Sequence, residues 1–179
     1  HPAQSNVPVL NAAASEEGRA FAMRNADFLF TPVFDFDQAS ETVEDIAIRA
    51  KAVGRDVKVL TFSTVVCRPT QAEADDYLDY YANQHADWEA VDNLMTLQGL
   101  HAQSFTKEAL AAFRDRFAAG HGGFPLVGTP DHIADQLEKM SATGVAGTTL
   151  AFVDYAKEFP YFRQEVLPRL EARGLRAPA

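Results

Sequence analysis

Little in this chain of 179 residues could cross-link it or hold it in a membrane. It has one cysteine, Cys67, so no disulfide can form within the chain, and this thiol ends an apolar run where a small core residue fits. No apolar run approaches the roughly 18 residues of a membrane-spanning helix. We therefore expect no membrane span and a reducing compartment, the cytoplasm.

Basic side chains are also scarce, because 16 Lys and Arg stand against 25 Asp and Glu, a net charge of −9 with His neutral. A surface this negative repels a phosphate backbone or an anionic lipid surface, so we expect neither nucleic acid nor a membrane as partner. The histidines lack metal-ligand spacing: His85 and His101 are 16 residues apart, and His121 and His132 are 11 apart. The sequence therefore predicts no metal site. Only His121, in a glycine-rich loop, is a candidate to lie near a substrate.

Apolar runs alternate along the chain with segments of helical periodicity. Strands are predicted over residues 7–12, 27–31, 57–67 and 148–153. Helices are predicted over residues 15–25, 40–53, 129–144 and 154–173. A long and mostly helical segment, from about Gln71 to Ala119 with a break near Gly99, leads into a flexible loop over 120–125. This segment is longer than an ordinary connection between a strand and a helix, so we interpret it as an insertion.

Strands separated by helices favour a parallel sheet with right-handed crossovers. Four such units make half of a TIM-type (β/α)₈ barrel, or else a small open sheet. We expect an α/β chain in which residues 1–179 form a single partial domain. Residues 71–124 would be a helical insertion that acts as a mobile lid. Because the chain begins at His1 without Met, we expect a processed product, a fragment or an expression product.

The segment after the first strand is the most informative for function. Asn11 and three alanines end the strand, and Ser15 follows where a helix N-cap belongs. Small side chains let a ligand approach the backbone, and the free N–H groups of a first helical turn attract an anion such as phosphate. Arg19 would add a positive charge one turn further on. Two observations favour a purely structural cap instead: Ser is a common N-cap without any ligand, and Glu16 and Glu17 would repel a phosphate.

Residues 9–30 resemble the segment around the fifth strand of luciferase-like flavin monooxygenases. They contain an apolar strand, small residues, Ser15, two variable positions, Gly18-Arg19, an aromatic residue, then Ala26-Asp27 and another strand. Near the other end, residues 125–130 (PLVGTP) and the helix and strand that follow are similar to the end of the barrel in the same family. The branch of closest style contains pyrimidine, nitrilotriacetate and sulfone monooxygenases. The resemblance implies that this chain is the C-terminal half of such a barrel.

The resemblance implies that Ser15 binds the phosphate of reduced FMN, with backbone groups at Ala14 and the charge of Arg19 beside it. It also implies reaction with O₂ and a small organic substrate, a separate flavin reductase that supplies the reduced FMN, and a homo-oligomer when the barrel is complete. The first four βα units, absent here, would carry most of the ring pocket and the catalytic residues. We therefore expect the chain alone to be inactive. The alternatives are a deazaflavin (F420)-dependent oxidoreductase on the same barrel, or a non-catalytic relative that binds flavin or phosphate.

Overall fold

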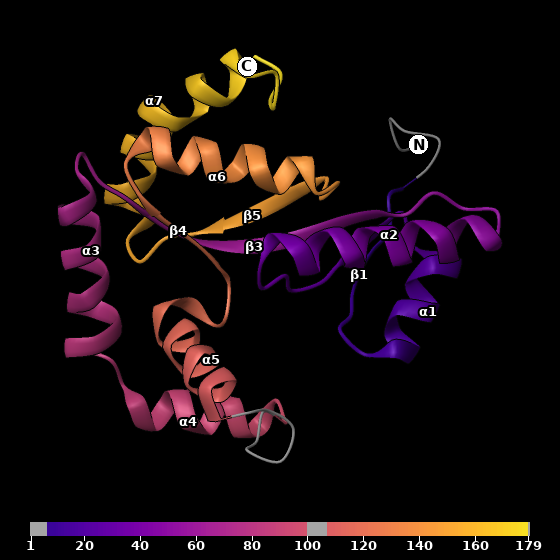
Figure 1. Cartoon of the computed structure of the whole chain (residues 1–179), viewed down its shortest axis with the longest axis horizontal. Helices are drawn as coiled ribbons and strands as arrows, with labels where there is room; N and C mark the ends of the chain where they lie inside the picture. Colours follow the sequence, from indigo (N-terminus) through magenta and orange to yellow (C-terminus); the bar gives the residue numbers. More distant parts are fainter. Residues whose placement is uncertain (1–6, 100–106, 179) are drawn as a thin grey trace. The chain divides into compact units, whose positions relative to one another are not determined.

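The computed structural model describes residues 7–99 and 107–178 (Figure 1). His1 and His101, about which the sequence made predictions, lie outside these ranges. The chain divides into two compact units, His1–Phe62 with Lys139–Thr149 and Ser63–Glu138 with Leu150–Ala179. Strand β3 (Lys58–Cys67) contributes its first half to one unit and its second half to the other.

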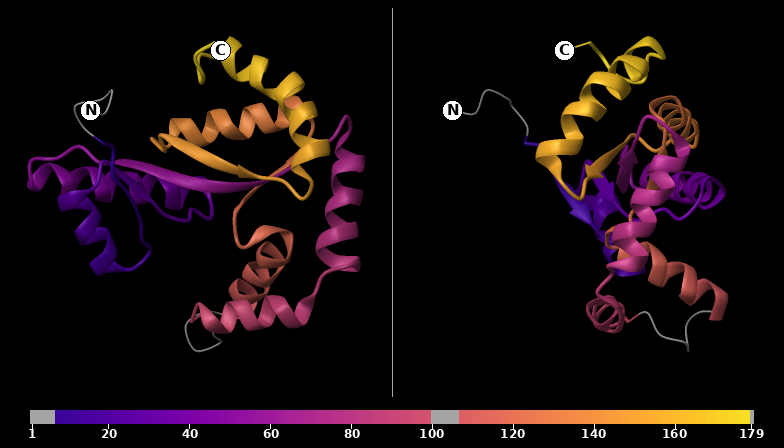
Figure 2. Two further views of the ribbon diagram at one scale, coloured as in Figure 1. Left: turned by 180° about the vertical axis from the view of Figure 1, so that it is seen from behind. Right: turned by 90° about the vertical axis from the view of Figure 1, so that its left-hand side faces the viewer.

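The first unit contains three parallel strands: β1 (Leu10–Ala12), β2 (Phe28–Phe30) and the first half of β3. Helix α1 (Glu16–Asn25) connects β1 to β2, and α2 (Phe36–Ala52) connects β2 to β3. The helices α1 and α2 contact each other and lie side by side in the left-hand view of Figure 2. The two βα units predicted for this part of the sequence are therefore present, although β1 is shorter than predicted.

The two faces of the sheet in the first unit differ in exposure. Leu29 and Val59 are neighbours in register and are buried, as expected under a layer of helices. On the opposite face Leu10 is 52% exposed, and Phe30 stacks on Phe62 with ring centroids 5.9 Å apart. Helices cover only the outer face of a (β/α)₈ barrel, so the less covered face corresponds to the barrel interior.

The second unit pairs the last half of β3 in parallel with β4 (Phe124–Gly128), in register from Ser63 onward. The sequence prediction was wrong here, because it placed a flexible loop over 120–125 and no strand after it. Pro125 cannot donate a ladder hydrogen bond, and the glycines before it are typical of a loop. Tertiary pairing overrides both signals, and Leu126 in the middle of β4 is fully buried. The last strand, β5 (Gly147–Ala151), also pairs with β3.

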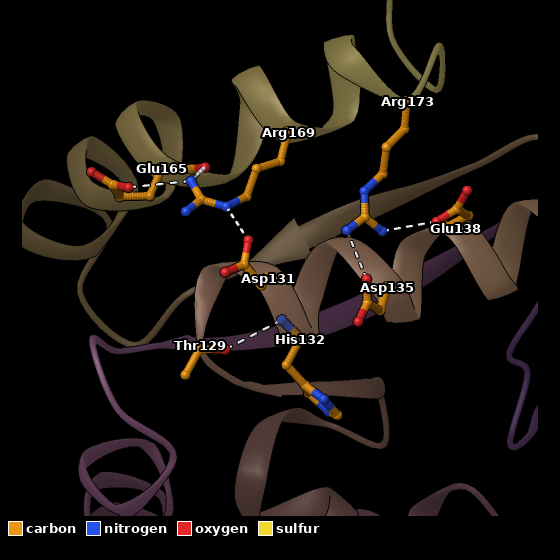
Figure 3. Close-up of polar contacts among 8 residues, drawn as sticks. All are labelled: Thr129, Asp131, His132, Asp135, Glu138, Glu165, Arg169 and Arg173. Carbon is orange, nitrogen blue, oxygen red and sulfur yellow. Dashed lines mark hydrogen bonds and ion pairs between the residues drawn. The ribbon is translucent and has the colours of Figure 1, made fainter.

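Helices α6 (Pro130–Ala142) and α7 (Tyr155–Ala172) are joined by ion pairs on one side. Arg169 of α7 pairs with Asp131 of α6, and Arg173, at the C-cap of α7, pairs with Asp135 and Glu138 (Figure 3). The N···O distances are 2.6 to 2.8 Å. Each exposed pair contributes at most about 1 kcal/mol, so the row fixes how the two helices align more than it stabilises the unit.

Helix N-caps account for where two helices begin. Thr129 accepts a hydrogen bond at Oγ1 from the backbone N–H of His132, 3.3 Å away, which confirms the predicted cap of α6 (Figure 3). Asp35 caps α2 by accepting from the N–H of Gln38 at 2.7 Å. The prediction overlooked this second cap and began the helix four residues too late.

The insertion after β3 is helical, as predicted. It comprises α3 (Gln71–Asp79), the π-helix η1 (Tyr80–Gln84), α4 (Trp88–Leu97) and α5 (Lys107–Gly120). The predicted break near Gly99 is observed, since α4 ends two residues earlier. Helices α4 and α5 pack together (Figure 1), and Arg114 joins them with two hydrogen bonds to Asp92, at 2.6 and 3.0 Å. That the insertion moves as a lid stays a prediction.

Candidate functional site

Ser15 caps α1 at the carboxyl-terminal end of β1. Its Oγ accepts a hydrogen bond from the N–H of Gly18, 3.2 Å away, and its backbone is extended, with φ −74° and ψ 156°. The N–H groups of Glu16 and Glu17 have no acceptor among the residues that the structure describes. The side chain of Ser15 and the neighbouring Ala14 are exposed. The first turn of α1 therefore offers free donors and the positive end of a helix dipole to an anion.

The charges around this turn favour an anion more than the sequence suggests. Glu16 is paired with Arg49 of α2, and one of its two contacts with that guanidinium measures 3.2 Å. Arg19 has no such partner: its Nε is buried and makes no hydrogen bond to any residue in the described ranges. Among the described residues of this turn, Glu17 keeps an unpaired negative charge, while Glu16 is neutralised by Arg49.

Gly18 allows the turn to approach the loop after β1 closely. A Cβ at this position would lie 2.6 Å from the Cβ of Ala13 and 3.3 Å from the Oγ of Ser15. Ala13 is itself held in place, because its N–H donates to the carbonyl oxygen of Phe30 at 3.0 Å. The small residues of this segment therefore have a measurable structural role, and they keep side chains away from the exposed donors.

A second polar cluster lies in the other unit, at the end of β3, and sequence reasoning missed it. The carboxylate of Glu158, in the first turn of α7, is 7% exposed. Its Oε1 accepts from the hydroxyl of Tyr77 and from the N–H of Asp154, both at 3.0 Å. Arg68, the residue after β3, lies 3.6 Å from Oε2 and stacks over the ring of Tyr77, 4.0 Å from its centroid.

The protonation state of Tyr77 is fixed in this cluster. Burial and the hydrogen bond to Glu158 raise the pKa of Tyr77, so its hydroxyl stays neutral and donates. The guanidinium of Arg68 is fixed beside the end of a barrel-type strand, where such folds bind their ligands. One feature of the sequence could have identified Arg68, because it directly follows the longest run of β-type residues. Nothing in the sequence pairs it with a residue 90 positions later.

No histidine in the described ranges makes a hydrogen bond or ring contact with a residue of either cluster. His121 is exposed in the turn before β4, with φ 56°, and its Nε2 is 3.1 Å from the Nε2 of Gln98. His132 is exposed on α6. Over residues 7–99 and 107–178, no three His, Cys, Asp or Glu side chains are grouped so that they could hold a metal ion. Across the same ranges, no helix combines the length and apolar character needed to cross a membrane.

The model of the luciferase-like monooxygenase family matches residues 1–147. The chain belongs to this family. Its α/β architecture, a parallel sheet with a helical insertion after β3, is that of half a TIM-type barrel, as the resemblance implies. This finding excludes the small open sheet that the sequence left possible. The relatives are monooxygenases, which are oxidoreductases.

The FMNH₂-dependent dimethylsulfone monooxygenase of Pseudomonas fluorescens is 30% identical over 180 aligned residues, which cover 93% of this chain and 48% of that protein. The crystal structure of DmoA from Hyphomicrobium sulfonivorans shares the fold, with a TM-score of 0.77 at 24% identity over 92% of this chain and 41% of that one. A riboflavin lyase with modified FMN and riboflavin has the same TM-score of 0.77 at 26% identity, covering 94% and 43%. The chain spans about half the length of the relatives it matches.

Proposed function

We propose that this chain forms the C-terminal half of a flavin-dependent monooxygenase and holds the phosphate of reduced FMN at the start of α1. The observation that carries the proposal is the turn at Ser15, where exposed N–H donors and a hydroxyl lie at the start of α1 and Arg19 follows one turn further along the helix. A dianionic phosphate fits these groups, because a helix N-terminus and a guanidinium both favour negative charge. The FMNH₂ dependence of the sulfone monooxygenase relative supports the choice of flavin.

In this proposal the residues of the chain bind and position the cofactor. The N–H groups of Glu16 and Glu17 and the hydroxyl of Ser15 donate to phosphate oxygens, and Arg19 balances their charge. Reduced FMN supplies the electrons that activate O₂ toward a small organic substrate, and a separate flavin reductase regenerates it. The chain orients the flavin from its phosphate end, while the ring and the reacting atoms depend on the rest of the barrel.

The less covered face of the sheet in the first unit indicates that this half of the barrel needs the other half to cover it. Leu10 is half exposed there and the Phe30–Phe62 stack is only partly covered, so four further strands would bury apolar surface now facing water. Completing the barrel would also add the loops at the ends of the other strands. The substrate, and the catalytic groups that act on it, belong to that complete protein.

The test compares FMN with riboflavin, which lacks the phosphate, in the protein that contains the complete barrel. Ser15→Ala should weaken FMN binding by about 1 kcal/mol, or roughly fivefold, through a lost hydrogen bond to a charged group. Riboflavin affinity should not change. Ser15→Asp keeps an N-cap but adds a negative charge, so it should weaken FMN binding further. Asp35→Ala, which removes the cap of α2 in the same unit, is the matched control and should leave the affinity unchanged.

Equal FMN affinity of wild type and Ser15→Ala would refute the phosphate assignment. The reaction class is tested separately. Reduced FMN, O₂ and a sulfone or sulfide should give substrate-dependent oxygen uptake and an oxygenated product. Hydride transfer to or from a deazaflavin without oxygen uptake would instead favour the deazaflavin oxidoreductase. Flavin binding with neither reaction would favour a non-catalytic relative.

A further inference from the structure

The second unit contains a cavity of about 150 Å³ between the sheet and the insertion. Its strand side is formed by Thr64, Pro125 and Val127, which share one face of the β3–β4 pair because Thr64 lies opposite Pro125 in register. The insertion forms much of the remaining wall. Leu78 comes from α3, Tyr81 from η1 and Ala119 from α5.

Two hydroxyl groups of this wall are already used within the protein. The hydroxyl of Tyr81 donates to the carbonyl oxygen of Ala119 at 3.0 Å, and that of Thr64 donates to the carbonyl oxygen of Gly120 at 3.3 Å. Burial raises the pKa of Tyr81 to about 12, so its ring is uncharged near neutral pH. Asp115 and Arg116 also line the cavity, but their charges are opposite, so together they offer no net charge to a ligand, and the surface that a ligand would meet is mainly carbon.

Two of the walls meet at a close contact. The end of α5 meets β3 as closely as glycine permits, because a Cβ on Gly120 would lie 2.5 Å from the Oγ1 of Thr64. Tyr81 lies in the π-helix η1, a rare backbone form that is frequent at functional sites. A larger residue at Ala119 would fill the space, yet the smallest chiral side chain stands there. These features are typical of a built cavity rather than of a gap in packing.

We propose that this cavity binds the uncharged, apolar part of the substrate, a group about the size of benzene. An apolar cavity of about 150 Å³ holds benzene, which sets the size. That this ligand is the substrate rests on the function proposed above, whereas the preference of the cavity for a small uncharged group does not.

The probe is fluorobenzene, titrated into the protein that carries this chain and followed by ¹⁹F NMR. Ala119→Leu adds three carbon atoms inside the cavity and should weaken fluorobenzene binding at least tenfold. Ala112→Leu makes the same change on the exposed side of α5 and should leave the affinity within twofold of wild type. Leu78→Ala enlarges the cavity and should shift the preference toward the bulkier 4-fluorocumene, which keeps the test valid if Ala119→Leu does not fold.

The cavity proposal is overturned if wild type does not bind fluorobenzene, or if neither Ala119→Leu nor Leu78→Ala changes the selectivity. The flavin proposal fails independently of it. If the cavity variants bind fluorobenzene as wild type does while FMN binding depends on Ser15, only the cavity proposal is refuted. If the variants change fluorobenzene binding as expected but the protein binds no FMN, the cavity proposal is supported and the proposed function is refuted.

Discussion

Gly18→Ala tests whether close approach, rather than backbone flexibility, requires a glycine in the first turn of α1. The added Cβ would lie 2.6 Å from the Cβ of Ala13, a separation that forces the backbone to shift. Overpacking of this kind costs about 1 to 3 kcal/mol, while replacing glycine by alanine within a helix returns up to about 1 kcal/mol. We expect a net loss of about 1 to 2 kcal/mol in the free energy of unfolding.

The assay is urea denaturation followed by circular dichroism, with an unchanged dependence on urea as the sign that only stability has changed. Ala13→Gly removes the atom that clashes and is the matched partner in a double-mutant cycle. In that background Gly18→Ala should be neutral or stabilising, so the two changes should couple by at least about 1 kcal/mol. Additive effects, or a Gly18→Ala protein as stable as wild type, would show that the turn relaxes freely and that the close contact does not shape the site.

Three further outcomes are expected. Burial raises the pKa of Cys67 from 9.0 to about 11 and that of Tyr81 from 10.0 to about 12, so the unfolded chain loses protons first. The free energy of unfolding should therefore fall as the pH rises from about 9 to 12, and Cys67→Ala should flatten the first part of that fall; a constant value would contradict it. Hydrogen exchange should be faster over 71–124 than over 57–66, and uniform protection would rule out a mobile lid. The chain alone, given reduced FMN, should consume oxygen only at the rate of free reduced flavin, so oxygenated product would show that the rest of the barrel is dispensable.

Local chemistry made much of this protein readable from its sequence. Apolar runs separated by helical periods indicated the α/β order, because the periods of side chains along a strand and a helix differ. Ser15 and Thr129 marked helix starts, since a cap needs only residues within one turn. The long segment after β3 was identified as a helical insertion by its length and composition. Each of these features depends on neighbours along the chain.

Only the tertiary structure decided what depends on neighbours in space. Strand β4 forms because β3 supplies its pairing partner, against the local signal of Pro125. Arg49 pairs with Glu16 across 33 positions and so changes the charge at the proposed phosphate site. Tyr77 meets Glu158 across 81 positions. Such contacts follow from the register of strands and the docking of helices, which many side chains determine together and no short pattern encodes.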